Sequence, residues 1–218
     1  MRNYPSILFG LECALDDFHA YKQPLYNTNF AKGKDSIAIN GLIWMGTYEE
    51  MRKRIEEKIA LGFHCIKVKI GAIDFEKEYD LLQRIRNDFS AKEITLRVDA
   101  NGGFSSREAY EKLERLAKLD IHSIEQPIKA GQWNEMAKLC KATPLPIALD
   151  EELIGVNDST KKEELLDKIQ PQYIIIKPSL HGGKRGGEEW IHLAQQKNFL
   201  KVILKAKQKL ILLKMEFH

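Results

Sequence analysis

Three acidic residues stand where short hydrophobic runs end. Asp99, Glu125 and Asp150 follow such runs at intervals of about 26 residues, which is close to the length of one strand, one helix and their two loops. Acids on successive parallel strands would meet at one edge of the sheet, and an α/β barrel carries its active site at that edge. The spacing therefore predicts a carboxylate-rich site at the strand ends.

Lysines stand on the strands that frame these acids. Lys67 and Lys69 alternate with apolar residues within residues 65–70, so both side chains lie on one face of the predicted strand. Lys177 ends a later apolar run, residues 173–176. Charged side chains within apolar strands are rare unless they are paired or functional, so we expect these lysines to serve the same edge.

The elements that must position these residues alternate between strand and helix. Strands are predicted around residues 37–44, 65–70, 96–99, 124–125, 146–149 and 173–176, and each is followed by an amphipathic helix. Two of the helices begin with a capping-box pattern, Thr47 with Glu50 and Ser105 with Glu108. Alternation of this kind predicts an α/β fold, an incomplete TIM-type (β/α) barrel of about six βα units.

Composition restricts the class of protein without identifying it. The 34 basic and 31 acidic residues nearly balance, and the lysines are scattered, so no nucleic-acid partner is expected. Three cysteines without metal-binding spacing favour a reducing, cytoplasmic location. No apolar run has the length of a membrane span. We therefore expect a small-molecule partner and no membrane partner, and composition leaves the oligomeric state open.

Structural explanations compete with these functional ones. A single acid at a strand end often caps a helix or forms a loop ion pair, although three acids at unit spacing make that explanation weak. Lys67 is as well explained by pairing with the acids as by catalysis. His64, His122 and His181 lack ligand spacing, so ordinary packing or loop roles are favoured for them. The glycine pairs at 182–183 and 186–187 are expected to turn the chain rather than to bind phosphate.

The order of these residues resembles the enolase superfamily in its muconate-lactonizing subgroup. The resemblance spans residues 6–196 and rests on five elements in register: Lys67-x-Lys69, Asp99-x-Asn101, Glu125-Gln126-Pro127, Asp150-Glu151 and Lys177. Residues 41–44, 123–128 and 177–183 are most similar to the o-succinylbenzoate synthase family within that subgroup.

The resemblance implies a role for each of these residues. It implies that Mg²⁺, or Mn²⁺ in its place, is held by Asp99, Glu125 and Asp150. Asn101 and Glu151 would support the ligands, Lys69 would be the general base, Lys67 would assist it and Lys177 would steady the enediolate.

The implied reaction is removal of a proton alpha to a carboxylate, followed by dehydration, in menaquinone biosynthesis. Dipeptide epimerases and muconate cycloisomerases share the same scaffold and stay open as alternatives. From the residues alone, a Schiff-base aldolase that uses Lys177 is a third alternative. A fourth is an inactive enzyme fragment.

The resemblance also predicts a division of the chain. Residues 1–36 correspond to a bridging helix and connection left from a capping domain that is otherwise missing, and residues 37–197 to a partial (β/α) barrel. Residues 198–218 read as a tail that does not follow the barrel pattern. On this interpretation the chain is truncated and its activity is impaired.

Overall fold

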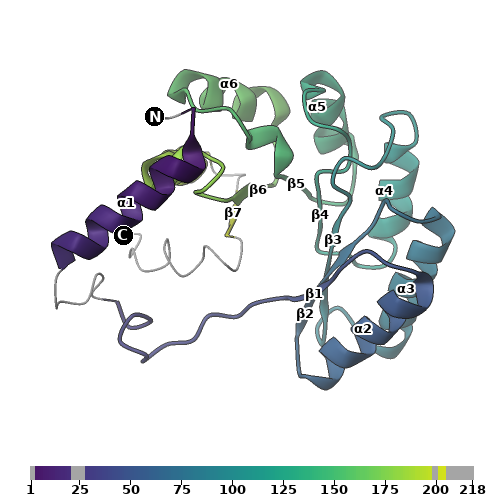
Figure 1. Cartoon of the computed structure of the whole chain (residues 1–218). Coiled ribbons are helices and arrows are strands. Elements are labelled where there is room, and N and C mark those ends of the chain that lie inside the picture. Colours follow the sequence, from purple (N-terminus) through teal and green to yellow (C-terminus); the bar gives the residue numbers. More distant parts are fainter. Residues whose placement is uncertain (1–2, 21–27, 198–200, 205–218) are drawn as a thin grey trace. The chain divides into compact units, whose positions relative to one another are not determined.

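Strands and helices alternate along the chain (Figure 1). The computed structural model describes residues 3–20, 28–197 and 201–204. The strands are β1 Gly41–Ile43, β2 Cys65–Lys69, β3 Thr95–Asp99, β4 Ser123–Glu125, β5 Ile147–Leu149, β6 Tyr173–Ile176 and β7 Lys201–Leu204. The helices are α1 Pro5–Ala20, α2 Tyr48–Ala60, α3 Phe75–Asp88, α4 Ala109–Ala117, α5 Trp133–Ala142, α6 Ser159–Ile169 and α7 Gly183–Gln196, with a 3₁₀ turn at Glu151–Leu153.

The strands follow one another in the sheet in sequence order, from β1 to β7. The pairings from β1 to β5 are all parallel. Six strands are each followed by a helix, and a seventh strand comes after them. The predicted α/β fold with about six βα units is confirmed.

The chain divides into two compact units, which are described separately. The larger unit comprises Ile39–Glu152 and Leu166–Tyr173, and the smaller comprises Met1–Ala38, Leu153–Leu165 and Ile174–His218. The larger unit contains β1 to β5 and α2 to α5, and the smaller one contains α1, α7 and β7.

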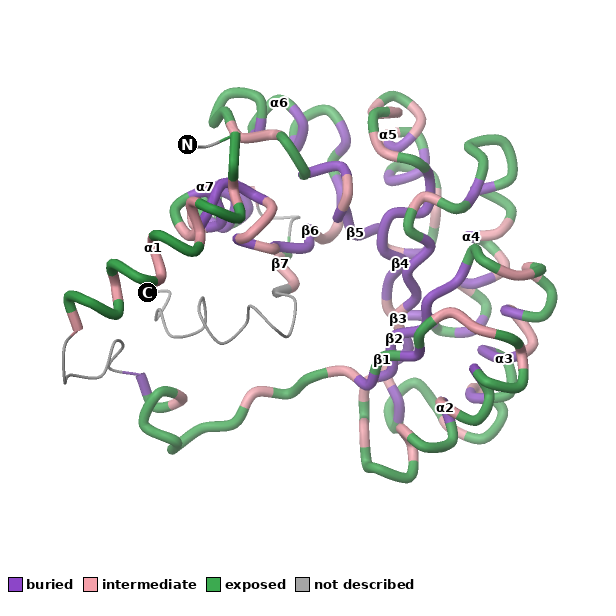
Figure 2. The backbone as a smooth tube through the Cα atoms, in the orientation of Figure 1, coloured by how far each residue is buried: buried purple, intermediate pink, exposed green. Residues whose placement is uncertain are grey.

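The core of the larger unit lies between its strands and its helices. Strand residues such as Ile66, Val98 and Ile124 are fully or almost fully buried, and they meet apolar faces of the helices through residues such as Leu82 and Leu113. Figure 2 shows the burial concentrated along the strands, while the outward sides of the helices are exposed. Burial of these aliphatic side chains, at about 25 cal/mol per Å² of apolar surface, holds the helices against the sheet.

Local sequence signals explain some of the helix ends in this unit. The capping box of Thr47 and Glu50 starts α2, and Gly62, at φ +78°, follows its last turn, as predicted. The second predicted capping pattern is present in part. The Glu108 N–H donates to Ser105 Oγ at 3.4 Å, as the pattern predicts, but residues 106–108 form a turn and α4 begins only at Ala109. The first strand is also shorter than predicted, because only Gly41–Ile43 pairs with β2.

In the smaller unit, α1 packs against α7. The Glu12 carboxylate accepts hydrogen bonds from the backbone N–H groups of Lys184 and Arg185 in the first turn of α7. Gly182 and Gly183 adopt positive φ angles of +88° and +78° at the start of that helix. The second glycine pair, predicted to turn the chain, lies inside α7, so that prediction is wrong.

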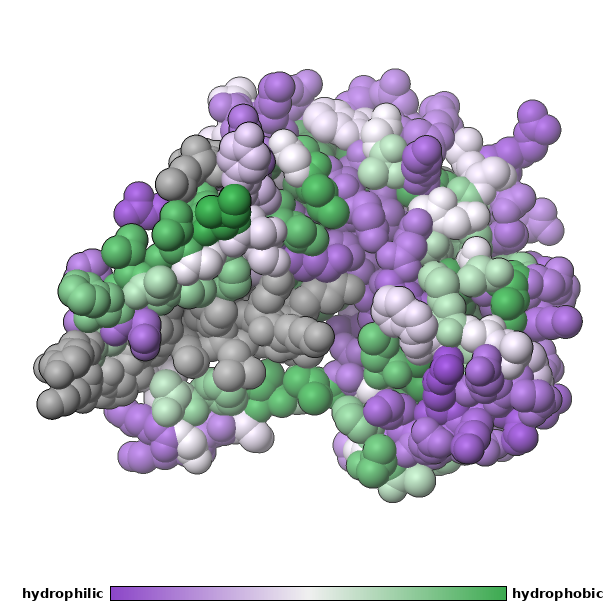
Figure 3. All heavy atoms as spheres, viewed as in Figure 1, coloured by the Kyte–Doolittle hydropathy of each residue, from purple (hydrophilic) through white to green (hydrophobic). Residues whose placement is uncertain are grey.

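Helix α1 carries no buried residue, although its sequence is rich in apolar side chains. Ile7, Leu15 and Phe18 are 62%, 55% and 77% exposed, and Figure 3 shows hydrophobic side chains along this helix. Within the described residues, no helix combines the length and the apolar composition needed to cross a bilayer. Strand β7 lies in the predicted tail, whose residues 205–218 fall outside the described part of the chain.

Candidate active site

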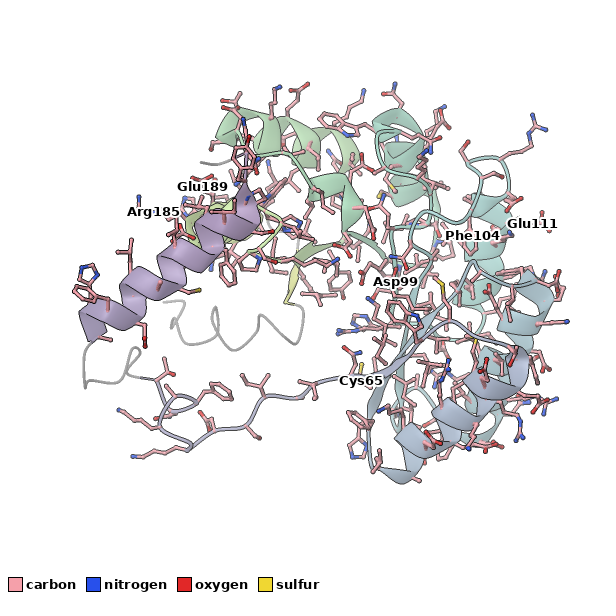
Figure 4. The ribbon with its side chains drawn as sticks, viewed as in Figure 1. Cys65, Asp99, Phe104, Glu111, Arg185 and Glu189 are labelled. Atoms are coloured by element: carbon pink, nitrogen blue, oxygen red, sulfur yellow. The ribbon has the colours of Figure 1, made fainter. Side chains whose placement is uncertain are left out.

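The predicted acids and lysines of the larger unit gather at the carboxyl ends of its parallel strands. Lys69 of β2 is the register partner of Asp99 on β3, and Asp99 is the register partner of Glu125 on β4. Cys65 begins β2, and Figure 4 shows it away from Asp99, toward the other end of the strands. The alternation of side chains that was read from the sequence therefore aligns three charged residues across three strands.

Two lysines neutralise the buried carboxylates. Lys67 Nζ lies 2.7 Å from Asp99 Oδ2 and donates a hydrogen bond to Glu125, and Lys69 Nζ also lies 2.7 Å from Asp99 Oδ2. Asp99 is completely buried, and Lys67, Lys69 and Glu125 are each at most 8% exposed. Charges removed from water in this way are tolerated only when they are paired and hydrogen-bonded. The four residues therefore form one interdependent charge cluster.

Lys69 has two further partners besides Asp99. Its Nζ donates a hydrogen bond to Asn101 Oδ1, and the Asn101 amide donates to Glu151 Oε1 at 2.8 Å. Asn101 adopts a positive φ of +46°, a conformation that few residues other than glycine take readily. Lys69 Nζ also lies 5.6 Å from the centroid of the Trp44 ring, within cation–π distance. Asn101 thus contacts Lys69 directly and Glu151 is linked to it through Asn101, and their supporting role stays a prediction.

Trp44 is a site residue that the sequence reasoning missed. It follows β1 directly and is 59% exposed, so its ring lies at the same strand-end edge as the charge cluster. A signal was available, because a large exposed aromatic residue directly after the first barrel strand lies where such folds bind ligands.

Asp150 follows β5 and is completely buried. Its backbone N–H donates to the Gln126 side-chain oxygen at 3.2 Å. Gln126 and Glu152, which accepts a hydrogen bond from Gln126, are buried polar residues that the sequence reasoning did not assign to the site. The only signal for Gln126 was its place in the Glu-Gln-Pro sequence next to Glu125.

The donor chemistry at this edge fits a hard divalent cation. Carboxylate oxygens are the ligands that Mg²⁺ prefers, and Glu151 Oε2 is buried without a hydrogen-bond partner among the described residues. The arrangement, however, places Lys67 between Asp99 and Glu125. Within the described part of the chain, no three His, Cys, Asp or Glu side chains are grouped as a metal site. The three-carboxylate metal site stays a prediction.

Lys177 belongs to the smaller unit, where it directly follows β6. Its backbone N–H donates to His181 Nδ1 at 3.1 Å, and the His181 N–H returns a hydrogen bond to Lys177 O at 3.1 Å. His181 is fully buried, and its burial, reinforced by Lys177 and Lys162, lowers the pKa of the imidazole to about 3. The ring is therefore neutral near pH 7 and accepts at Nδ1.

Comparisons with known proteins agree on one family. The family model described as enolase C-terminal domain-like matches residues 50–206. The o-succinylbenzoate synthase of Desulfotalea psychrophila is 49% identical over 195 residues, which are 89% of this chain. An L-amino acid-D/L-Glu epimerase of Francisella philomiragia is 31% identical over 177 residues, or 80% of this chain and 48% of that protein.

Solved structures give the same picture. The crystal structure of MenC from Desulfotalea psychrophila has a TM-score of 0.83 and 46% identity, covering 93% of this chain and 56% of that one. The substrate-liganded L-Ala-D/L-Glu epimerase of Bacillus subtilis has a TM-score of 0.69 and 26% identity, covering 77% and 46%. The chain spans about half the length of the curated relatives that it matches, 53% in the case of the Desulfotalea synthase.

Proposed function

This chain belongs to the enolase C-terminal domain-like family, and we propose that it is the barrel part of an o-succinylbenzoate synthase, a carbon–oxygen lyase. The proposed reaction removes a proton alpha to a carboxylate and then expels a hydroxyl group as water. The 49% identity to a synthase over 89% of the chain supports this choice over the epimerases, which are near 30%. The observation that carries it is the buried Lys67, Lys69, Asp99 and Glu125 cluster at the strand ends.

Lys69 is the proposed general base. Its Nζ lies on the strand-end edge, close to the Trp44 ring and to Asn101, and is held there by three neighbours rather than left to rotate freely. A base held at a fixed position is the geometric requirement for proton abstraction. In the neutral form Lys69 would take the alpha proton, and in the protonated form it would return a proton to the departing hydroxyl.

Lys67 is proposed to bridge Asp99 and Glu125 and to offset the repulsion between their negative charges, because it contacts both carboxylates. Lys177 is proposed as the second lysine of the reaction from its place at the end of β6 in the family pattern, and His181 fixes its backbone.

Asp99, Glu125 and Asp150 are the proposed holders of Mg²⁺, with Mn²⁺ as a substitute. When bound, the cation supplies the positive charge that stabilises the negative charge gathering on the substrate carboxylate. Lysine contacts neutralise Asp99 and Glu125, and all three carboxylates are completely or almost completely buried.

The test is an assay for o-succinylbenzoate formation by the chain in the presence of Mg²⁺, alongside an assay for epimerisation of L-Ala-L-Glu and L-Lys-L-Arg dipeptides. Formation of o-succinylbenzoate that depends on Mg²⁺ and on Lys69 supports the proposal. Epimerisation without dehydration would assign the site to the epimerase branch of the family. Trapping of a carbonyl substrate on Lys177 by borohydride would assign it to Schiff-base chemistry instead.

A further inference from the structure

Gln126 has a backbone conformation that needs an explanation. It follows Glu125 directly and adopts a φ of +41°, in the left-handed region that side-chain-bearing residues rarely occupy. Its N–H donates to Ala148 O at 2.9 Å, and its own carbonyl accepts from Gly102 N at 2.7 Å. The peptide is therefore fixed from β5 on one side and from the loop after β3 on the other. Strain of this kind persists only where the surroundings determine the conformation.

The Gln126 side chain uses all of its hydrogen-bonding capacity. Its Oε1 accepts from the N–H groups of Asp150 and Glu152, each at 3.2 Å. Its Nε2 donates to Ile128 O at 3.0 Å and to Glu152 Oε2 at 3.1 Å. A glutamine amide has two donor hydrogens and one oxygen with two acceptor positions, and the residue is completely buried. A single side chain thus ties the loop after β4 to the loop after β5.

Glu152 completes the connection. It is 4% exposed, and while Oε2 accepts from Gln126, Oε1 accepts from Gly131 N at 2.7 Å. The carboxylate therefore fixes both ends of the loop that begins at Gln126. Glu152 itself is two residues beyond Asp150, in the 3₁₀ turn Glu151–Leu153.

We propose that Gln126 and Glu152 act as a pair of positioning residues that fix the backbones of Glu125 and Asp150 relative to each other, so that both acids can serve one divalent cation. This inference rests on the proposed function, since it takes Glu125 and Asp150 as ligands of the cation. Gln126 directly follows Glu125, and its side-chain oxygen accepts a hydrogen bond from the backbone N–H of Asp150. A shift of this amide would move the two carboxylates relative to each other, and oxygen ligands of Mg²⁺ tolerate little departure from octahedral geometry.

The experiment exchanges the donor and the acceptor within the pair. In Gln126→Glu, two carboxylates face each other where an amide donated to a carboxylate. In Glu152→Gln, the residue must lose either the Gly131 or the Gln126 hydrogen bond. In the double variant the amide of residue 152 donates to the carboxylate of residue 126, so the contact is restored in reverse. The matched control is Gln83→Glu, which adds the same charge at an exposed position on α3.

The full chain is used throughout, and the primary measurement is the affinity for Mn²⁺, followed by electron paramagnetic resonance of the free ion. Gln126→Glu is expected to weaken Mn²⁺ binding at least about 10-fold, and Glu152→Gln about 3-fold to 10-fold. The double variant is expected to bind more tightly than Gln126→Glu, a non-additivity that follows from direct contact. Gln83→Glu is expected to match the wild type.

The measurement separates this inference from the proposed function. A wild-type chain that binds no Mn²⁺ would overturn the proposed metal site and the inference with it. A wild-type chain that binds Mn²⁺ while Gln126→Glu binds equally tightly would overturn the inference alone. A purely structural role is also recognisable, because chemical unfolding of the metal-free variants would show lost stability while the Mn²⁺ affinity of the folded protein stayed unchanged.

Discussion

Lys69 of β2 and Asp99 of β3 are register partners on neighbouring parallel strands, and their Nζ and Oδ2 atoms lie 2.7 Å apart. Both side chains are buried, so this contact is made where water does little to screen it. The proposed base therefore cannot move independently of a proposed metal-binding carboxylate. Changing either residue should disturb the other, and this coupling shapes the first two predictions.

Replacement of Lys69 by alanine should lower turnover of the proposed reaction by about 10²–10⁴-fold, the usual effect of removing a general acid–base group. Lys69→Arg should be nearly as inactive, because a guanidinium keeps the positive charge beside Asp99 but does not give up its proton. The matched control is Lys138→Ala, since Lys138 pairs with Glu135 at 2.8 Å on the exposed side of α5. Wild-type turnover in Lys69→Ala would move the base to another residue.

Each of the substitutions Asp99→Asn, Glu125→Gln and Asp150→Asn should weaken Mg²⁺ or Mn²⁺ binding, which calorimetric titration measures directly. The expected loss is largest for Asp99→Asn, because that residue also holds Lys67 and Lys69, and the variant leaves two buried ammonium groups without their shared carboxylate. Glu135→Gln, at an exposed residue paired with Lys138, is the matched control. Unchanged affinity in all three variants would contradict the assignment of these acids as ligands.

Burial lowers the pKa of His181 from 6.5 to about 3, with Lys177 and Lys162 adding to the effect. The unfolded chain binds a proton near pH 6.5 and the folded chain does not, so the stability contributed by the neutral ring is complete above pH 6.5 and is lost as the pH falls toward 3. Between pH 6.5 and pH 5 the loss should approach about 2 kcal/mol, at 1.36 kcal/mol per pH unit.

The measurement is urea unfolding at pH 7 and pH 5 for the wild type, His181→Asn and the control His64→Asn. Asparagine keeps an acceptor for Lys177 N but does not titrate, so this variant should lose about 2 kcal/mol less than the wild type over the same range. His64 is exposed, and its replacement should leave the pH dependence unchanged. Parallel pH dependence in all three proteins would contradict the role given to His181.

The sequence was most informative where one local signal determined the outcome. Asp99 and the two lysines could be placed on one face because side chains alternate along a strand, and the α2 capping box depends only on Thr47 and its third neighbour. At Ser105 the predicted hydrogen bond from the Glu108 N–H also forms, but residues 106–108 make a turn, so α4 starts later than the pattern predicts.

Other features could not be read from the sequence, because they depend on contacts between distant residues. Several partners of Gln126 are distant in sequence, including the N–H groups of Asp150 and Glu152 after β5, and nothing in its own neighbourhood predicts a positive φ. The glycines at 186–187 favour a turn by local propensity, yet they lie within α7. Gly186 packs so close to His181 O that an added Cβ would clash, so close approach explains a glycine at this position.

Glu12, on α1, should stabilise the smaller unit by capping the N-terminus of α7, a helix that is far from it in the sequence. Its carboxylate accepts from the N–H groups of Lys184 and Arg185 in the first turn of α7, where N–H groups have no partner within the helix and the helix dipole is positive. Lys184 Nζ binds Asp16 at 2.7 Å beside it. Glu12→Ala should therefore reduce the free energy of unfolding by about 1–2 kcal/mol, measured by urea titration at pH 7.

Glu12→Gln keeps an acceptor and should lose less. Asp17→Asn removes a charge at an exposed position of the same helix, so it should have almost no effect. Equal stability of Glu12→Ala and Asp17→Asn would show that the contact between α1 and α7 does not depend on this cap.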